Sequence, residues 1–199
     1  MSNTNRYVGD TVSADCRNAD LNYRLDLRVI TDTEKGPIEA TTGEFASTKA
    51  ITEGKLYNDK LRSVLAFKCH LNSLLKKLLY LPQSQASEVH MPILQIMGQN
   101  ISLCVLSLID KQVYSVQNTL DAEYPRTLAG IKTEGIRKII DLLGQVEYMM
   151  DGIEKNMKNY SHNTNSKMKG IIGKGKCIRQ FETEAWTSSV QWDTYIFDE

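Results

Sequence analysis

The order of apolar and polar positions predicts one strand near the start of the chain. In residues 21–30, LNYRLDLRVI, apolar residues alternate with polar ones. A period of two is typical of a half-buried strand. Asp32, Gly36 and Pro37 follow with a turn composition, and residues 38–42 are predicted to return as the second strand of a hairpin.

A period of three to four residues predicts an amphipathic helix over residues 56–81. The apolar positions that recur there are Tyr57, Leu61, Val64, Phe67, Leu71, Leu74, Leu78 and Leu81. Lysines and an arginine occupy the other faces, as expected of a helix with one buried side. Pro82 is expected to end this helix.

The longest uncharged stretch, residues 89–109, contains no Asp, Glu, Lys or Arg in a chain of which 24% is charged. So long a neutral run has to be buried. We interpret it as a helix from about Pro92 to about Leu120, with two apolar stripes that need helices on both sides. A membrane span is disfavoured, because Gln95 and Gln99 would place amides in lipid.

A third helix is predicted to begin at Thr127 or Thr133, after the break DAEYP, and to run to Lys158. Its apolar residues keep a near-heptad spacing, which suits a long contact with a neighbouring helix. Four glycines weaken it by roughly 1 kcal/mol each relative to alanine, so its first turns are expected to be irregular.

These elements predict a mainly α fold: an antiparallel three-helix bundle with a small β element from the N-terminal strand and the C-terminal segment. Residues 1–55 are assigned to an arm with the hairpin, of which residues 1–20 are too polar to order alone. Residues 56–158 are assigned to the helical core and 159–199 to a basic linker with an acidic, aromatic tail. Because three helices cannot cover so much apolar surface, the pattern also predicts a homo-oligomer.

Charge is balanced over the whole chain but not along it. The 24 basic and 24 acidic residues give no net charge, which excludes a global attraction to polyanions. The segment 155–179 nevertheless holds seven basic residues and no acid, and residues 180–199 hold five acids and no base. Contacts to single-stranded nucleic acid are predicted for Lys167, Lys169, Lys174, Lys176 and Arg179. The alternative is that this segment only neutralises the acidic tail.

Within this segment, residues 171–179, IIGKGKCIR, resemble the G-x-x-G loop of KH domains. The resemblance implies backbone contacts with single-stranded nucleic acid. It covers nine residues, and Lys176 stands where the family has its second glycine. The overlapping stretch 170–177 has the spacing of a P-loop, but Cys177 occupies the position of the magnesium-binding hydroxyl.

The acidic tail carries aromatic residues that predict a docking segment for a protein partner: Trp186, Trp192, Tyr195 and Phe197. The four cysteines are widely spaced, as buried thiols of a reducing compartment are, and the polar N-terminus lacks a secretory pattern. We therefore expect a cytoplasmic protein that is not embedded in a membrane.

No residues form a complete catalytic or metal-binding motif. Cys69 and His70 are adjacent on a predicted helix and point about 100° apart, so they are poorly placed to share a metal ion. No Ser, Cys or His has a recognisable nucleophile context, and no cofactor is expected. The favoured hypothesis is a non-enzymatic, self-associating structural or adaptor protein, coat-like or scaffold-like. The alternatives are nucleic-acid binding through 155–179, regulated by the acidic tail, and an enzyme of a type that the sequence does not reveal.

Overall fold

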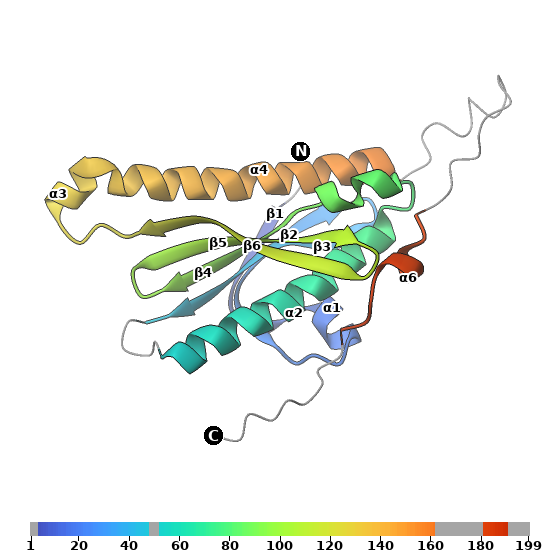
Figure 1. Ribbon diagram of the computed structural model, residues 1–199, viewed down its shortest axis with the longest axis horizontal. Coiled ribbons are helices and arrows are strands. Elements are labelled where there is room, and N and C mark those ends of the chain that lie inside the picture. Colours follow the sequence, from blue (N-terminus) through green and yellow to red (C-terminus); the bar gives the residue numbers. More distant parts are fainter. Residues whose placement is uncertain (1–3, 48–51, 162–180, 191–199) are drawn as a thin grey trace, which may run out of the picture.

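The computed structural model describes residues 4–47, 52–161 and 181–190, and side chains from residue 11 onward. It shows a mixed α/β fold built on one six-stranded sheet (Figure 1). The strands are β1 (Thr4–Val12), β2 (Arg24–Thr33), β3 (Gly36–Ala46), β4 (Met91–Met97), β5 (Asn100–Asp110) and β6 (Val113–Glu123). The helices are α1 (Ala14–Asn18), α2 (Glu53–Lys77), α3 (Leu128–Gly130), α4 (Ile136–Tyr160) and α6 (Thr183–Trp186), with the 3-10 helix η2 (Gln83–Glu88) and the π-helix η3 (Ile131–Gly135).

The strands lie in the sheet in the same order as in the chain, from β1 to β6. Neighbouring strands are antiparallel except β3 and β4, which are parallel. A parallel pair needs a crossover connection, and α2 with η2 supplies it. Figure 1 shows α4 along one face of the sheet and α2, with α1 beside it, along the opposite face.

The predicted three-helix bundle is wrong, because residues 92–120 contain no helix. The neutral run forms β4 and β5 instead, joined by a tight turn in which Gly98 has a φ of 65°. Its predicted burial is confirmed for most positions, and Met91, Leu103 and Leu106 are fully buried. A strand that helices cover on both faces buries every side chain, which produces a continuous apolar run rather than an alternating one.

The two other long helices are confirmed as α2 and α4. Thr52 caps α2, its hydroxyl accepting a hydrogen bond from the Lys55 amide at 3.1 Å. The largest core cluster joins α2 to the sheet through Phe67, Leu71, Leu74, Leu75, Leu78, Met91, Ile93 and Leu106. A second cluster joins Leu142 and Val146 of α4 to the opposite face of the sheet. The sheet is therefore the middle layer of three.

The expected irregularity before α4 is confirmed at η3. There Thr133 leaves helical geometry with φ −98° and ψ 56°, and Glu134 has a positive φ of 65°. Gly135 lies so close to the preceding turn that an added Cβ would be 2.7 Å from the carbonyl oxygen of Gly130. This glycine therefore permits the sharp entry into α4.

The N-terminal hairpin is confirmed as β2 and β3, whose antiparallel register joins Leu27 to Gly43 and Asp32 to Pro37. The expectation that residues 1–20 form an arm without structure of its own is wrong for Thr4–Asn18, which form β1 and α1. Backbone pairing with β2 orders β1 and requires no apolar pattern in its sequence. Among the described helices, none combines the length and the apolar character needed to cross a membrane.

Candidate functional site

Strand β6 is one of the two edges of the sheet. It spans 11 residues and pairs with β5 along its whole length, from Asn100 opposite Glu123 to Asp110 opposite Val113. No other described strand pairs with its outer side. The backbone groups of that side are therefore available to a further strand.

The β6 edge exposes apolar side chains on both faces of the sheet. Val116 lies opposite Leu106, which packs toward α2, and Leu120 lies opposite Leu103, which packs toward α4. Val116 is 37% exposed and Leu120 38%. We call the outer side of residues 113–120 the β6 edge surface.

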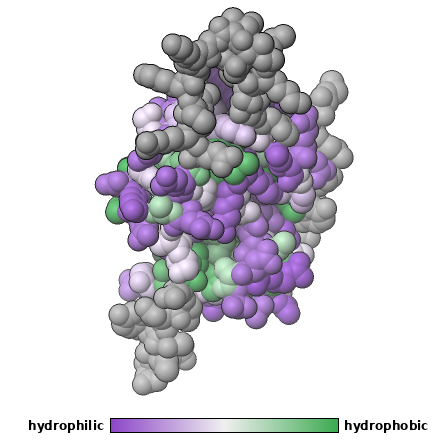
Figure 2. Space-filling model, turned by 90° about the vertical axis from the view of Figure 1, so that its right-hand side faces the viewer, coloured by the Kyte–Doolittle hydropathy of each residue, from purple (hydrophilic) through white to green (hydrophobic). Residues whose placement is uncertain are grey.

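The apolar surface continues around the β5–β6 turn, where Ile109 and Val113 are both exposed. Figure 2 views the end of the molecule at which this turn and α6 lie, and hydrophobic patches appear there among hydrophilic residues. The sequence predicted a helix over β6 and therefore missed this surface. The signal that marks it is the pair of β-branched Val113 and Val116 after the turn residues Lys111 and Gln112.

Charge is confined to one end of β6. Residues 113–120 hold no Asp, Glu, Lys or Arg, and Asp121 and Glu123 lie at the C-terminal end of the strand. Edge strands that avoid pairing usually carry lysine, proline or a bulge along the exposed side. The opposite edge has such a bulge, because the register of β1 against β2 shifts between Val8 and Thr11. The register of β6 against β5 shifts in two places, near Thr119 of β6 and near Ile109 of β5, but residues 113–120 contain no lysine or proline.

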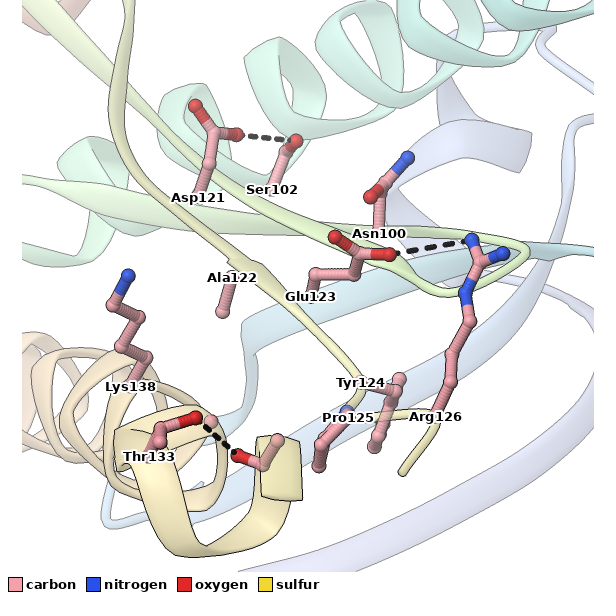
Figure 3. Close-up of a pocket in the computed structure, with 12 residues that line it drawn as sticks. Asn100, Ser102, Asp121, Ala122, Glu123, Tyr124, Pro125, Arg126, Thr133 and Lys138 are labelled. Carbon is pink, nitrogen blue, oxygen red and sulfur yellow. Dashed lines mark hydrogen bonds and ion pairs between the residues drawn. The ribbon is translucent and has the colours of Figure 1, made fainter. Parts of the chain in front are cut away.

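A pocket of about 660 Å³ lies where β6 ends, between the sheet and the start of α4 (Figure 3). Asp121 projects beside it and accepts hydrogen bonds from the Ser102 hydroxyl at 2.6 Å and from the Asn118 amide at 2.9 Å. Glu123 forms an ion pair with Arg126 at 3.2 Å. Lys138 reaches toward the same space from α4.

This pocket offers hydrogen bonds and charges of both signs, and its hydroxyl groups belong to Ser102, Tyr124 and Thr133. Neither Cys nor His is among the described residues that line it. Both Glu123 and Arg126 are more than half exposed, so water screens their ion pair and it holds the pocket only weakly.

Most residues predicted to bind a partner lie outside the described residues. This applies to Lys167, Lys169, Lys174, Lys176 and Arg179 of the basic segment and to Trp192, Tyr195 and Phe197 of the tail. Their roles stay predictions. Trp186 lies in α6, where its ring centroid is 6.0 Å from that of Phe181 and its carbonyl oxygen accepts a hydrogen bond from the Gln112 amide. It packs against the core of its own chain.

The cysteine and histidine residues that the structure describes lie in three separate places. His90 hydrogen-bonds to the Ser107 hydroxyl at 2.7 Å, and Cys104 is buried in the core beneath α2. Cys69 and His70 lie on α2 beside Cys16 of α1. The described residues hold no group of three or more Cys, His, Asp or Glu arranged to bind a metal ion.

Comparisons with protein-family models, with curated proteins and with solved structures find no match for this chain.

Proposed function

We propose that this chain is a non-enzymatic assembly protein whose copies associate through the β6 edge surface. The observation that carries the proposal is an edge strand of 11 residues with exposed Val113, Val116 and Leu120 and no charge over residues 113–120. A second β6 would satisfy the outer backbone groups and cover these side chains at the same time. The sheet would then continue across two copies.

The charges favour an antiparallel arrangement of the two strands. In a parallel pair in matching register, the acids Asp121 and Glu123 of one copy would lie beside the same acids of the other. Antiparallel pairing places the acidic ends at opposite ends of the contact, each next to the uncharged start of the other strand. Antiparallel pairing of identical strands has twofold symmetry, which is the commonest symmetry of homodimers.

The proposal also fits the location expected from the sequence. Cys16, Cys69 and Cys104 are free thiols, which a reducing compartment preserves. We therefore propose the cytoplasm as its location. Fractionation of cells that express a tagged chain tests this, and recovery with secreted or organellar proteins would contradict it.

The mass of the full chain in solution tests self-association. Light scattering coupled to size-exclusion chromatography at micromolar concentration is expected to give twice the 22.5 kDa of one chain. Val116→Lys places a charge in the middle of the β6 edge surface and is expected to give a monomer, because a charge on an edge strand opposes pairing. A monomeric wild-type protein would end the proposal.

A matched substitution separates the β6 edge surface from other exposed apolar residues. Tyr148 of α4 is 75% exposed and lies on the helix rather than on the sheet edge. Tyr148→Lys is therefore expected to remain a dimer. If Val116→Lys stays dimeric while its circular dichroism is unchanged, copies associate through another surface and the assignment to β6 is wrong.

A further inference from the structure

Two cysteines and a histidine meet in a buried cluster between α1 and α2. Cys16 is fully buried, and His70 and Cys69 are 2% and 6% exposed. The sulfur of Cys16 lies 3.8 Å from Nε2 of His70, and the same nitrogen is 2.8 Å from the hydroxyl of Ser13. Cys16 and Cys69 belong to the same buried cluster of side chains. The fold thus brings together two thiols that lie 53 positions apart in the sequence.

The hydrogen bonds indicate which atoms carry protons. Nδ1 of His70 is buried without a hydrogen-bond partner, and a proton there would be costly. The proton of a neutral imidazole therefore resides on Nε2, which donates it to the hydroxyl of Ser13 at 2.8 Å. With the proton on Nε2, the N–H dipole lies 3.8 Å from the Cys16 sulfur and favours a negative charge there.

The two thiols differ in acidity for the same reason. The hydrogen bond from Cys69 lowers the pKa of Cys16, and His70 and Ser13 act in the same direction against the effect of burial. The hydrogen bond to Cys16, together with burial, raises the pKa of Cys69. Of the two thiols, Cys16 is therefore the more acidic, and the thiolate is the reactive form of cysteine.

A pocket gives this cluster a route to solvent. It has a volume of about 460 Å³ and lies between α1, α2 and residues 189–190. Cys69 lines it, together with Asp15, Asn72 and Lys76. Cys16 is fully buried and does not line the pocket, so a small molecule reaches its sulfur only by passing Cys69.

We propose that Cys16 and Cys69 form a redox-active dithiol that small hydroperoxides oxidise to a disulfide, with His70 as a positioning residue. Rapid disulfide formation requires two neighbouring thiols of unequal acidity, and here one of the two thiols lies beside an imidazole. Cys104 is buried away from this cluster and serves as an internal reference. The disulfide ties α1 to α2 and is reversed by thiol reductants.

The chemistry balances in two steps. The Cys16 thiolate attacks the terminal oxygen of a hydroperoxide, an S–O bond forms, the O–O bond breaks, and the departing alkoxide takes the proton of Cys69 to become an alcohol. The resulting Cys69 thiolate attacks the sulfenic acid of Cys16. The S–S bond forms and hydroxide leaves, taking up the proton that Cys16 had released to give water. Two thiols are oxidised and one hydroperoxide is reduced.

Oxidation of the full chain with hydrogen peroxide tests the proposal. After alkylation of the remaining thiols and proteolysis without reductant, mass spectrometry is expected to find a peptide pair linked through Cys16 and Cys69. Dithiothreitol is expected to restore both thiols. If no disulfide forms, or if Cys16 and Cys69 are found alkylated while another pair is linked, the proposal is overturned.

Variants separate the roles of the residues. Cys69→Ser is expected to form no disulfide and to accumulate a sulfenic acid at Cys16 that dimedone traps. His70→Leu is expected to slow disulfide formation at least tenfold, whereas His70→Gln, which can place an N–H near the position of Nε2, restores most of the rate. Cys104→Ser is the control and should react at the wild-type rate. Equal rates in His70→Leu and wild type would remove His70 from the mechanism, and a sulfenic acid on Cys69 rather than Cys16 would reverse the assignment of the nucleophile.

Discussion

The guanidinium of Arg28 on β2 donates two hydrogen bonds to the carboxylate of Glu39 on β3, and both side chains are almost buried. Nε of Arg28 lies 3.2 Å from Oε2 of Glu39, while Nη2 contacts the second carboxylate oxygen. Only 11% of the arginine side chain and 7% of the glutamate side chain are exposed. A third contact, from Nη1 to the hydroxyl of Thr11 at 3.3 Å, extends this network to β1. One arginine thus links three neighbouring strands.

Removing one member of this ion pair is expected to destabilise the fold strongly. Glu39→Gln removes the carboxylate of a nearly buried ion pair while keeping the Arg28 charge, a change that typically costs about 3–5 kcal/mol. The double variant Arg28→Met/Glu39→Met removes both charges and is expected to be more stable than Glu39→Gln alone. Urea denaturation of the three proteins measures the difference. A loss below 1 kcal/mol in Glu39→Gln, roughly the value of a surface pair, would show that water screens the pair.

Glu44 on β3 is expected to make stability depend on pH. Burial, followed by the charges of Asp26 and Asp59, raises the pKa of Glu44 from 4.5 to about 8. The folded protein therefore keeps a proton on Glu44 that the unfolded chain has lost at intermediate pH. Linkage then requires the free energy of unfolding to fall as pH rises from about 4.5 to about 8.

The variant Glu44→Gln tests this dependence, because glutamine does not titrate. Its free energy of unfolding, measured by denaturant at several pH values, is expected to fall less steeply than that of the wild type across this window. Below about pH 4.5 the free energies of unfolding of the two proteins should run parallel, because Glu44 of the wild type is then protonated in both the folded and the unfolded state. Parallel curves throughout would mean that the pKa of Glu44 is the same in the folded and the unfolded protein.

Two glycines near α4 are expected to respond oppositely to substitution by alanine. At Gly135 the new Cβ would lie 2.7 Å from the Gly130 carbonyl oxygen, so Gly135→Ala should cost roughly 1–3 kcal/mol. At Gly144, inside α4, a Cβ meets no atom within 4 Å, and alanine should stabilise the helix by about 0.5–1 kcal/mol. Thermal denaturation compares them. Equal effects at both positions would show that the turn before α4 relaxes freely.

Phe67 is expected to be among the most costly core residues to truncate. Its side chain is fully buried in the contact between α2 and the sheet, and its ring meets that of His70 edge-on at 5.5 Å. Phe67→Ala is expected to cost about 3–5 kcal/mol because it leaves a cavity. Tyr57→Ala, on the same helix at a position 59% exposed, is the control and should change stability by less than about 0.5 kcal/mol. Denaturant midpoints measure both, and a similar loss in the two variants would contradict this packing.

Oxidation of the proposed dithiol is expected to stabilise the protein. A disulfide between Cys16 and Cys69 closes a loop of about 50 residues, for which the chain-entropy model gives about 4 kcal/mol. Denaturation before and after peroxide treatment, with dithiothreitol as the reversal, measures this gain. Cys69→Ser should show no peroxide-dependent change. A wild-type protein that is destabilised on oxidation would indicate that the bond strains the contact between α1 and α2.

The sequence predicted α2, α4 and the hairpin β2–β3 because each repeats its pattern over many residues. In α2 the apolar positions from Phe67 to Leu78 match the side that packs on the sheet, and in α4 Ile139, Leu142 and Val146 do the same. Such patterns report one buried side and one exposed side within a single element. The irregular start of α4 was also predictable, because the glycines that allow it are local.

Local sequence patterns could not predict either candidate site. Cys16 lies in a polar segment whose sequence predicted no structure, and only the fold brings it against Cys69 and His70. The β6 edge surface likewise depends on position in the sheet. Val116 is exposed because no described strand follows β6 in the sheet. The spacing of residues within β6 carries no information about how many strands the sheet has.

The neutral run of residues 89–109 separates what the sequence determines from what the tertiary structure determines. By itself the sequence determined that this run is buried, because uncharged apolar side chains are excluded from water in any fold. Only the tertiary structure decided that it forms two strands, β4 and β5, rather than one helix. A run that is apolar at every position has no period, so its conformation follows from its partners: β3 and β6 on either side, α2 and α4 on the two faces.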